Sequence, residues 1–327
     1  MEAKELYEKV LELKQDHAIA HFNLANLLRK DLKDYKSAET YVIITYAYIH
    51  FLKSIKQKPK FTAALNNYAT MLHHQLKRYK DAEYYYLQAI CVDPQYSRAH
   101  FNYANLCREH LVKFETAQEH YLIALETDEN NPNFHNNYGL LLQYSLKNYR
   151  EAKTQYEEAL RLDPAHALGH CNYATILMQM VDKKYNPNMD DLSDPDEDSQ
   201  PRKISAKKRE LYLQKSEKHF KQSIQLNSQL VMAYNNYGCL LRRLERYDDA
   251  IKMFEKALTI DPKFVMAKRN LRKTHELNGT IPPKSTSTAN ENVSPPANPN
   301  SNSTSKITRN VNESERNVEK NENCSVM

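Results

Sequence analysis

The stretch "AHFNYANLC" at residues 99–107 is one of six closely similar segments in this 327-residue chain. The other five are "AHFNLANLL" (20–28), "ALNNYATML" (64–72), "FHNNYGLLL" (134–142), "GHCNYATIL" (169–177) and "AYNNYGCLL" (233–241). Successive segments are 44, 35, 35, 35 and 64 residues apart, measured between the asparagines that they share: Asn23, Asn67, Asn102, Asn137, Asn172 and Asn236. Self-similarity at a nearly fixed period is typical of a stacked repeat architecture.

A second pattern follows each of the last five segments, consisting of a small residue, an aromatic residue four positions later and a small residue three positions after that. Its members are Ala82/Tyr86/Ala89, Ala117/Tyr121/Ala124, Ala152/Tyr156/Ala159, Ser216/Phe220/Ser223 and Ala250/Phe254/Ala257. Both patterns place apolar or small residues at i, i+3, i+4 and i+7, which indicates helices. Asp-Pro pairs at 93–94, 163–164 and 261–262 are predicted to end second helices, because the residue before proline avoids the α region.

These patterns closely resemble the tetratricopeptide repeat family over roughly residues 1–275. The resemblance implies an all-α fold, a right-handed α-solenoid of antiparallel helix pairs with about six units in residues 1–277. Residues 3–14 match a second helix without a first, so the array is predicted to open with a partial unit. Residues 264–277 repeat the first-helix pattern with added positive charge, as expected of a capping helix.

Two insertions interrupt the period. Removing residues 43–51 restores the alignment of the first unit. We therefore expect an insertion in its second helix, either an extended helix whose end no longer packs as in other units or a looped-out bulge; a gene-model artefact is the third explanation. The fifth unit is longer by an acidic-to-basic segment at about 181–210, which is predicted to be a solvated loop. Within it, Ser193 and Ser205 match short phosphorylation motifs.

Residues 278–327 are rich in Asn, Ser and Pro and have no apolar period, so we predict a disordered tail. The tail ends in "CSVM", a motif typical of prenylation at Cys324, with the terminal Met favouring farnesyl. A single prenyl chain gives only weak membrane association.

The rest of the sequence argues against a catalytic, cofactor-binding or metal-binding site. Five cysteines form no CxxC pair, and no glycine-rich phosphate loop or hydrolase motif occurs, so we expect no enzyme, no cofactor and no metal. The "HH" pair at 73–74 has no carboxylate or cysteine at ligand spacing along its own helix. The start lacks the apolar core of a signal peptide, which predicts a cytoplasmic protein.

The recurrent asparagines are the candidate binding residues. They resemble the asparagine ladder in the repeat region of O-linked N-acetylglucosamine transferase, which implies that they hold the main chain of an extended peptide; the alternative is that they stabilise neighbouring helices. One turn further along lie Arg29, Arg108 and Arg242, which favour an acidic ligand. The chaperone carboxylate clamp is not expected, since asparagine stands where that clamp has arginine.

The sequence therefore predicts a non-catalytic scaffold or adaptor that binds an extended, acidic peptide of a partner protein. One alternative is a regulatory repeat region of a glycosyl transferase-like enzyme without its catalytic domain. RNA binding is a third interpretation, suggested by the 35-residue period of pentatricopeptide repeats, but the Asp-Pro endings disfavour it and no nucleic acid partner is expected.

Overall fold

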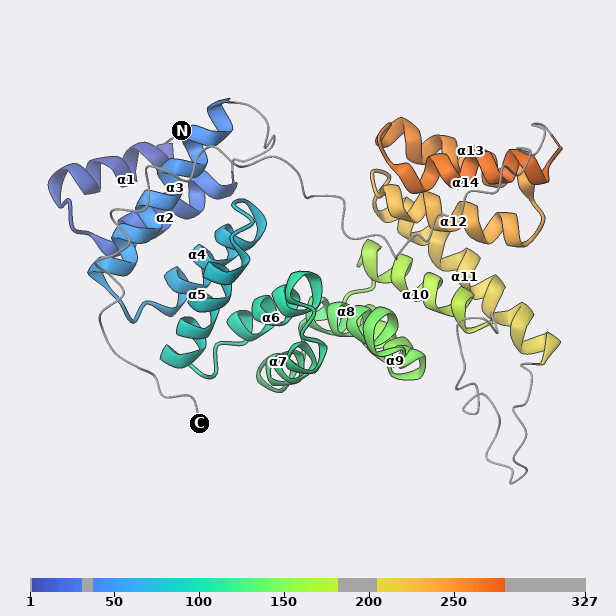
Figure 1. The fold of residues 1–327 in the computed structure, drawn as a ribbon, viewed down its shortest axis with the longest axis horizontal. Coiled ribbons are helices and arrows are strands. Elements are labelled where there is room, and N and C mark those ends of the chain that lie inside the picture. The colour runs from blue at the N-terminus through green and yellow to red at the C-terminus, as the bar shows by residue number, and fades with distance from the viewer. Residues whose placement is uncertain (1, 31–37, 182–204, 280–327) are drawn as a thin grey trace, which may run out of the picture. The chain divides into compact units, whose positions relative to one another are not determined.

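The computed structural model describes residues 2–30, 38–181 and 205–279, and within these ranges all regular elements are helices (Figure 1). Six antiparallel hairpins follow one another, which confirms the predicted repeat fold. The first helices are α2 (Ala18–Lys30), α4 (Thr62–His74), α6 (Ser97–Leu106), α8 (Pro132–Leu141), α10 (Ala167–Met180) and α12 (Val231–Arg243). The second helices are α3 (Ala38–Gln57), α5 (Tyr79–Val92), α7 (Phe114–Thr127), α9 (Tyr149–Leu162), α11 (Ala206–Leu226) and α13 (Tyr247–Ile260).

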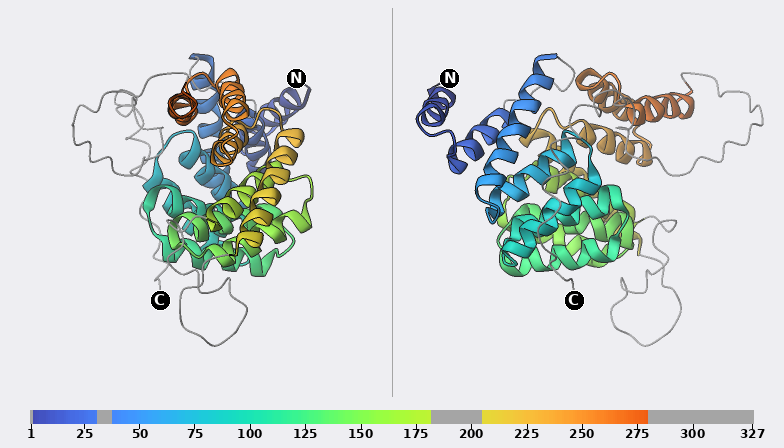
Figure 2. Two further views of the ribbon diagram at one scale, coloured as in Figure 1. Left: turned by 90° about the vertical axis from the view of Figure 1, so that its right-hand side faces the viewer. Right: turned by 60° about the vertical axis from the view of Figure 1, so that its left-hand side comes forward.

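One further helix lies at each end of the hairpins. Helix α1 (Glu2–Leu13) packs on α2, but Ala3 and Val10 of its triplet are exposed and only Tyr7 is half-buried. Helix α14 (Val265–Leu277) packs on α13 and α12, and the three helices lie side by side in every view (Figure 2). No helix in the described ranges combines the length and apolarity needed to cross a bilayer.

The small-aromatic-small triplets of the second helices form the core of the hairpins. Every member of the five triplets expected from the sequence is completely buried. The small residues let the first helices approach closely: a Cβ atom built on Gly139 of α8 would lie 2.7 Å from Cε1 of Tyr156 in α9. As predicted, α5, α9 and α13 end directly before the Asp-Pro pairs, where the aspartate backbone is extended.

The 35-residue units accommodate their extra residue at the end of the first helix. Helices α6 and α8 continue as single π-helical turns, η1 (Cys107–Leu111) and η2 (Leu142–Leu146). After η1, Val112 has a φ of 57°, and the Lys113 N–H bonds to the Cys107 carbonyl six residues back at 3.1 Å. The equivalent six-residue bonds join the N–H of Arg78 to the carbonyl of Leu72 and the N–H of Asn148 to the carbonyl of Leu142. In a shorter unit the corresponding bond spans five residues, from Arg246 to Leu241.

Helix α3 corrects the position that we predicted for the first insertion. Residues 43–51 neither loop out of the continuous helix nor keep its end from packing: Ala47, Phe51 and Ser54 are completely buried. They stand 35 residues before Ala82, Tyr86 and Ala89, so they are the triplet of this unit. The nine additional residues therefore precede Ala47 in the sequence, and lengthening a helix at its start leaves the register of its buried face unchanged.

The second insertion is shorter than predicted at its C-terminal end. Residues 182–204 lie outside the described ranges, but helix α11 already begins at Ala206, within the segment expected to be a loop up to about residue 210. The Ser205 hydroxyl caps this helix by accepting a hydrogen bond from the Lys208 N–H at 3.2 Å. A capped start allows the basic segment "AKKRE" to continue into the repeat helix.

Candidate functional site

The six recurrent asparagines all lie on first helices, at the same position in each. Asn172 is buried, with 5% of its surface exposed, and the other five are half-buried. The amides of the last five bond to the preceding first helix: Asn67 to Asn26 (2.8 Å), Asn102 to Asn66 (3.0 Å), Asn137 to Asn105 (3.0 Å), Asn172 to Asn136 (2.8 Å) and Asn236 to Thr175 (3.2 Å). These asparagines therefore link consecutive units.

The same amides retain capacity for a ligand. An asparagine side chain has two N–H donors and an oxygen with two lone pairs, and the bonds between helices use only part of this set. The Asn137 oxygen, for example, accepts one hydrogen bond from Asn136 at 3.0 Å, while its nitrogen donates to Asn105. A structural role between helices and a binding role at the surface are thus compatible for one side chain.

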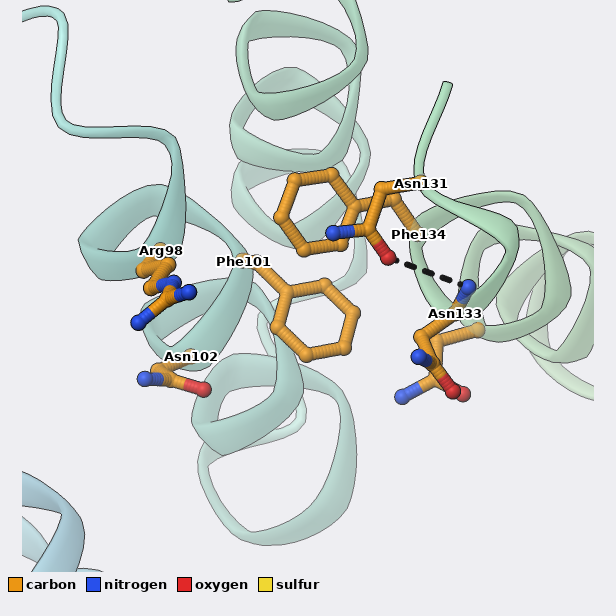
Figure 3. A pocket seen from close by; sticks show the side chains of 7 residues that line it. Arg98, Phe101, Asn102, Asn131, Asn133 and Phe134 are labelled. Carbon is orange, nitrogen blue, oxygen red and sulfur yellow. Dashed lines mark hydrogen bonds between the residues drawn. The ribbon is translucent and has the colours of Figure 1, made fainter. Parts of the chain in front are cut away.

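The six recurrent asparagines are called the asparagine ladder below. A pocket of about 290 Å³ lies where two of them, Asn102 and Asn137, meet the surface. Its lining comes from α6, from α8 and from the turn before α8: Arg98, Phe101, Asn102, Asn131, Asn133, Phe134 and Asn137. Figure 3 shows the two phenylalanine rings between Arg98 and Asn102 on one side and the asparagines of the turn on the other. The lining contains no histidine, cysteine or carboxylate, so the pocket itself offers no good metal ligand.

The phenylalanines form the floor of this pocket. Their rings stack with centroids 4.5 Å apart and planes inclined by 25°, and Phe134 is buried while Phe101 is half-buried. The Asn131 side chain caps α8 by accepting from the Asn133 N–H at 3.2 Å, which fixes the rim. Arg98 is exposed and is the one charged residue of the lining.

Two of the seven pocket residues, Asn102 and Asn137, were candidates from the sequence, and the other five were not. Phe101 and Phe134 belong to different positions of the repeat, so a comparison of equivalent positions does not bring them together. The signal that could have been used is "NNPN" at 130–133, which follows Asp128-Glu129, the pair that stands where other units have Asp-Pro. It supplies two amides at one helix start.

Models of the tetratricopeptide repeat match residues 132–166, which contain hairpin α8/α9, and residues 231–264, which contain α12/α13. Two of its helix hairpins match the tetratricopeptide repeat in sequence, and the described helices have the fold of that repeat. The pocket thus lies on the first helices of two consecutive repeat units, and one of the two matched segments supplies three of its seven lining residues.

Solved structures have the same fold at low sequence identity. They include one chain of the APC/C hetero-tetramer Cut9–Hcn1 (TM-score 0.61, 13% identity, covering 84% of this chain and 45% of that one). PilF of Pseudomonas aeruginosa has a TM-score of 0.56 at 16% identity, covering 78% of this chain and 97% of that one. A tetratricopeptide repeat protein of Parabacteroides merdae also has a TM-score of 0.56, at 13% identity, covering 83% of this chain and 90% of that one.

The chain also has sequence similarity to a known protein over a short segment. Over 70 residues the chain is 36% identical to Protein O-mannosyl-transferase F38B6.6 of Caenorhabditis elegans. The matched segment is 20% of this chain and 10% of that protein. The match is therefore confined to a length of about two tetratricopeptide units.

The arginines predicted beside the ladder do not line the pocket. In this tetratricopeptide array their position faces the aromatic residue of the second helix: Arg108 donates to the Tyr121 hydroxyl at 3.3 Å, and Arg242 lies 5.8 Å from the Phe254 ring centre. Arg29 occupies the same position on α2 and is half-buried. The positive charge at the pocket comes from Arg98 instead.

The three predicted modification sites have different outcomes. Ser205 is exposed and caps α11. Ser193 and Cys324 lie outside the described residues, so both remain predictions from the sequence.

Proposed function

We propose that this protein is a non-catalytic scaffold that binds an extended peptide of a partner protein at the pocket between α6 and α8. Tetratricopeptide repeat proteins generally bind peptides or proteins through surfaces formed by stacked units. The observation that supports this site is the pocket that adjoins Asn102 and Asn137, two consecutive residues of the ladder.

The lining indicates the chemistry of the peptide. An apolar or aromatic side chain would pack on the Phe101 and Phe134 rings, while the Asn102 and Asn137 amides pair with the peptide main chain on either side. Arg98 would attract a carboxylate or a phosphorylated residue next to that anchor. We therefore expect an extended ligand with an apolar anchor and an adjacent acidic group.

The test starts with a random-peptide display selection against the full chain, followed by affinity measurement of a short selected peptide by fluorescence anisotropy. Replacing Asn102 and Asn137 together by Ala removes two amides from the pocket and two bonds between helices. We expect binding to weaken by about 1–3 kcal/mol, at 0.5–1.5 kcal/mol for each hydrogen bond.

The matched control is the double variant Asn236→Ala and Asn270→Ala. It also removes two amide bonds between first helices, to Thr175 at 3.2 Å and to Asn235 at 2.9 Å, but neither residue lines the pocket. Both double variants should lose similar thermal stability, and only the first should lose affinity. Equal affinity in the two variants would show that the ladder is purely structural.

The sequence similarity to an O-mannosyl-transferase favours a second candidate function, as a repeat region that serves a glycosyl transferase. In that case the chain would present or recognise the peptide that another part modifies. Sequencing of full-length transcripts distinguishes the two: an in-frame continuation into a transferase supports the second function, and a stop codon after Met327 supports the scaffold.

We also propose farnesylation of Cys324, on the "CSVM" motif alone. One prenyl chain without a basic cluster would give weak, reversible membrane association. The intact mass of protein from eukaryotic cells should show the added lipid and the loss of the last three residues, and Cys324→Ser should abolish both. A mass that ends at Met327 without lipid would refute the proposal.

A further inference from the structure

His73 in α4 is a buried histidine without hydrogen bonds. The side chain exposes none of its surface, and neither Nδ1 nor Nε2 has a hydrogen-bond partner. Buried polar atoms without a partner are uncommon in folded proteins, because they lose water without a replacement; a strained or functional site, or a bound water or ion, accounts for those that occur. The neighbours of His73 are therefore informative.

Two ligand-type side chains of the next repeat unit lie close to this imidazole. The Glu109 carboxylate Oε2 is 3.8 Å from His73 Nε2 and 4.0 Å from His110 Nε2. One ligand atom from each of the three residues falls within 4.8 Å of the others, and no second group of this kind occurs in the described ranges. His73 comes from α4, whereas Glu109 and His110 come from η1.

The π-helical turn explains why these residues meet. Glu109 and His110 lie within η1, where the hydrogen-bond pattern departs from that of an α-helix, a feature often found at functional sites. His110 is held there by stacking on Tyr79, with ring centroids 4.0 Å apart. Since the partners stand 36 and 37 residues after His73, spacing within one helix does not reveal the group.

We propose that His73, Glu109 and His110 bind a divalent transition-metal ion, with Zn²⁺ as the best match to two imidazoles and one carboxylate. Ligands at about 2.1 Å from a tetrahedral ion stand roughly 3.4 Å from one another. The carboxylate-to-imidazole distances of 3.8 and 4.0 Å are slightly longer, and all three ligand atoms lie within 4.8 Å of one another, so side-chain rotations would bring the three groups to bonding distance. Three protein ligands leave a fourth position for water or for a side chain of a partner.

The surroundings orient the carboxylate for this role. Arg108 Nη2 lies 2.6 Å from Glu109 Oε1, so one carboxylate oxygen is occupied by the guanidinium and the other faces the histidines. Outer contacts of this kind fix a metal ligand and are common around metal sites. His74 stacks on His73 with ring centroids 4.0 Å apart and restrains its ring.

A bound ion would join two consecutive tetratricopeptide units, because its ligands come from the first helix of one and from the end of the first helix of the next. We expect the ion to stabilise the folded chain by mass action. The inference does not depend on peptide binding, since none of the three ligands lines the pocket between α6 and α8.

The test is titration of the untagged full chain, freed of metal by a chelator, with Zn²⁺ in a calorimeter and with Co²⁺ monitored by visible absorption. The variants are Glu109→Gln, which removes the anionic ligand on an exposed residue, and His110→Phe, which keeps a ring to stack on Tyr79. The control is Glu115→Gln, which removes an exposed carboxylate from the start of α7.

We expect one Zn²⁺ per chain in the wild type and in the Glu115 control, and affinity at least tenfold lower in the other two variants. Zn²⁺ should also raise the melting temperature of the wild type and of the control only. The proposal fails if Glu109→Gln and His110→Phe, folded by circular dichroism, bind Zn²⁺ as tightly as the wild type. It also fails if the wild type shows no saturable binding.

Discussion

The imidazoles of His100 in α6 and His120 in α7 face each other with their Nδ1 atoms 2.8 Å apart. The Nε2 of His100 is 3.1 Å from the Pro94 carbonyl oxygen, which can only accept, so that nitrogen carries the proton of the neutral ring. It follows that His100 Nδ1 accepts and His120 Nδ1 donates. The two rings thus hold the helices of one hairpin together in defined tautomers.

The same contact recurs in three other hairpins. His21 meets His50 at 2.7 Å and His170 meets His219 at 2.8 Å, again Nδ1 to Nδ1. In α8/α9 the second histidine is replaced by glutamine, and the Gln155 side-chain amide lies 2.7 Å from His135 Nδ1. His135 Nε2 faces the Glu129 carbonyl oxygen at 2.8 Å, so Nδ1 accepts and the amide N–H donates. The chain therefore contains a natural example of the contact with only one titratable partner.

The histidine pairs should make stability depend on pH. Burial, with the positive charge of the partner ring, lowers the pKa of His50, His120 and His219 from 6.5 to about 4. The unfolded chain therefore binds more protons than the folded chain between these values, so stability is complete above about pH 6.5 and is lost as the pH falls towards 4. Urea unfolding midpoints measured from pH 8 to pH 4.5 should decrease most below pH 6.5.

Replacing His50, His120 and His219 together by Gln should reduce this acid sensitivity. The glutamines can contact the first-helix histidines as Gln155 does, and they do not titrate. We expect a midpoint at pH 8 close to that of the wild type and a shallower decrease between pH 6.5 and 4.5. An unchanged slope would assign the acid sensitivity to other groups.

Gly139→Ala should destabilise the protein although alanine is the better helix former. Alanine gains roughly 0.5–1 kcal/mol over glycine inside a helix. Its Cβ, however, would meet the ring of Tyr156, which is completely buried and donates a hydrogen bond to Gln143 at 2.6 Å. Overpacking costs about 1–3 kcal/mol, so we expect a net loss in urea unfolding. A gain in stability would mean that the ring moves freely.

Val112→Asn should stabilise the chain. The valine has a φ of 57°, a conformation that is costly for a β-branched side chain and more accessible to asparagine, and with 65% of its surface exposed it has few contacts to lose. We expect a gain of about 1 kcal/mol in the free energy of unfolding. Val265→Asn is the control, exposed to a similar degree but helical, and should change stability by less than about 0.5 kcal/mol.

Much of the fold could be predicted from the sequence, because the repeat period and the small-aromatic-small triplets indicate which face of each helix is buried. The triplets that contain Tyr86, Tyr121 and Tyr156 are buried as expected. The insertion in the first unit was placed wrongly, because aligning the unit on Tyr41 and Leu52 ignores that Ala47 and Phe51 already have the triplet spacing.

The candidate site was less accessible to sequence analysis. The asparagine positions were found from the sequence. The amide bonds between consecutive first helices were not, because they depend on how the units stack, and the sequence of a single unit does not predict that stacking. The same limit applies to His73 and Glu109, which belong to different units and meet through a π-helical turn. A contact between units requires the geometry of both.

The most direct test of the proposed binding site is a charge exchange between Arg98 and the acidic residue of a selected peptide. Affinities are measured by fluorescence anisotropy for the wild type and Arg98→Glu, each with the selected peptide and with a version in which Lys replaces the acidic residue. Arg161→Glu, a charge reversal on the second helix α9, is the control. We predict that the wild type and the control bind the lysine peptide more weakly than the selected peptide. Arg98→Glu should bind the lysine peptide more tightly than the selected peptide. The coupling energy between residue 98 and the exchanged peptide residue should be about 0.5–3 kcal/mol. The same effect of lysine in all three proteins would contradict the assignment of the peptide to the pocket between α6 and α8.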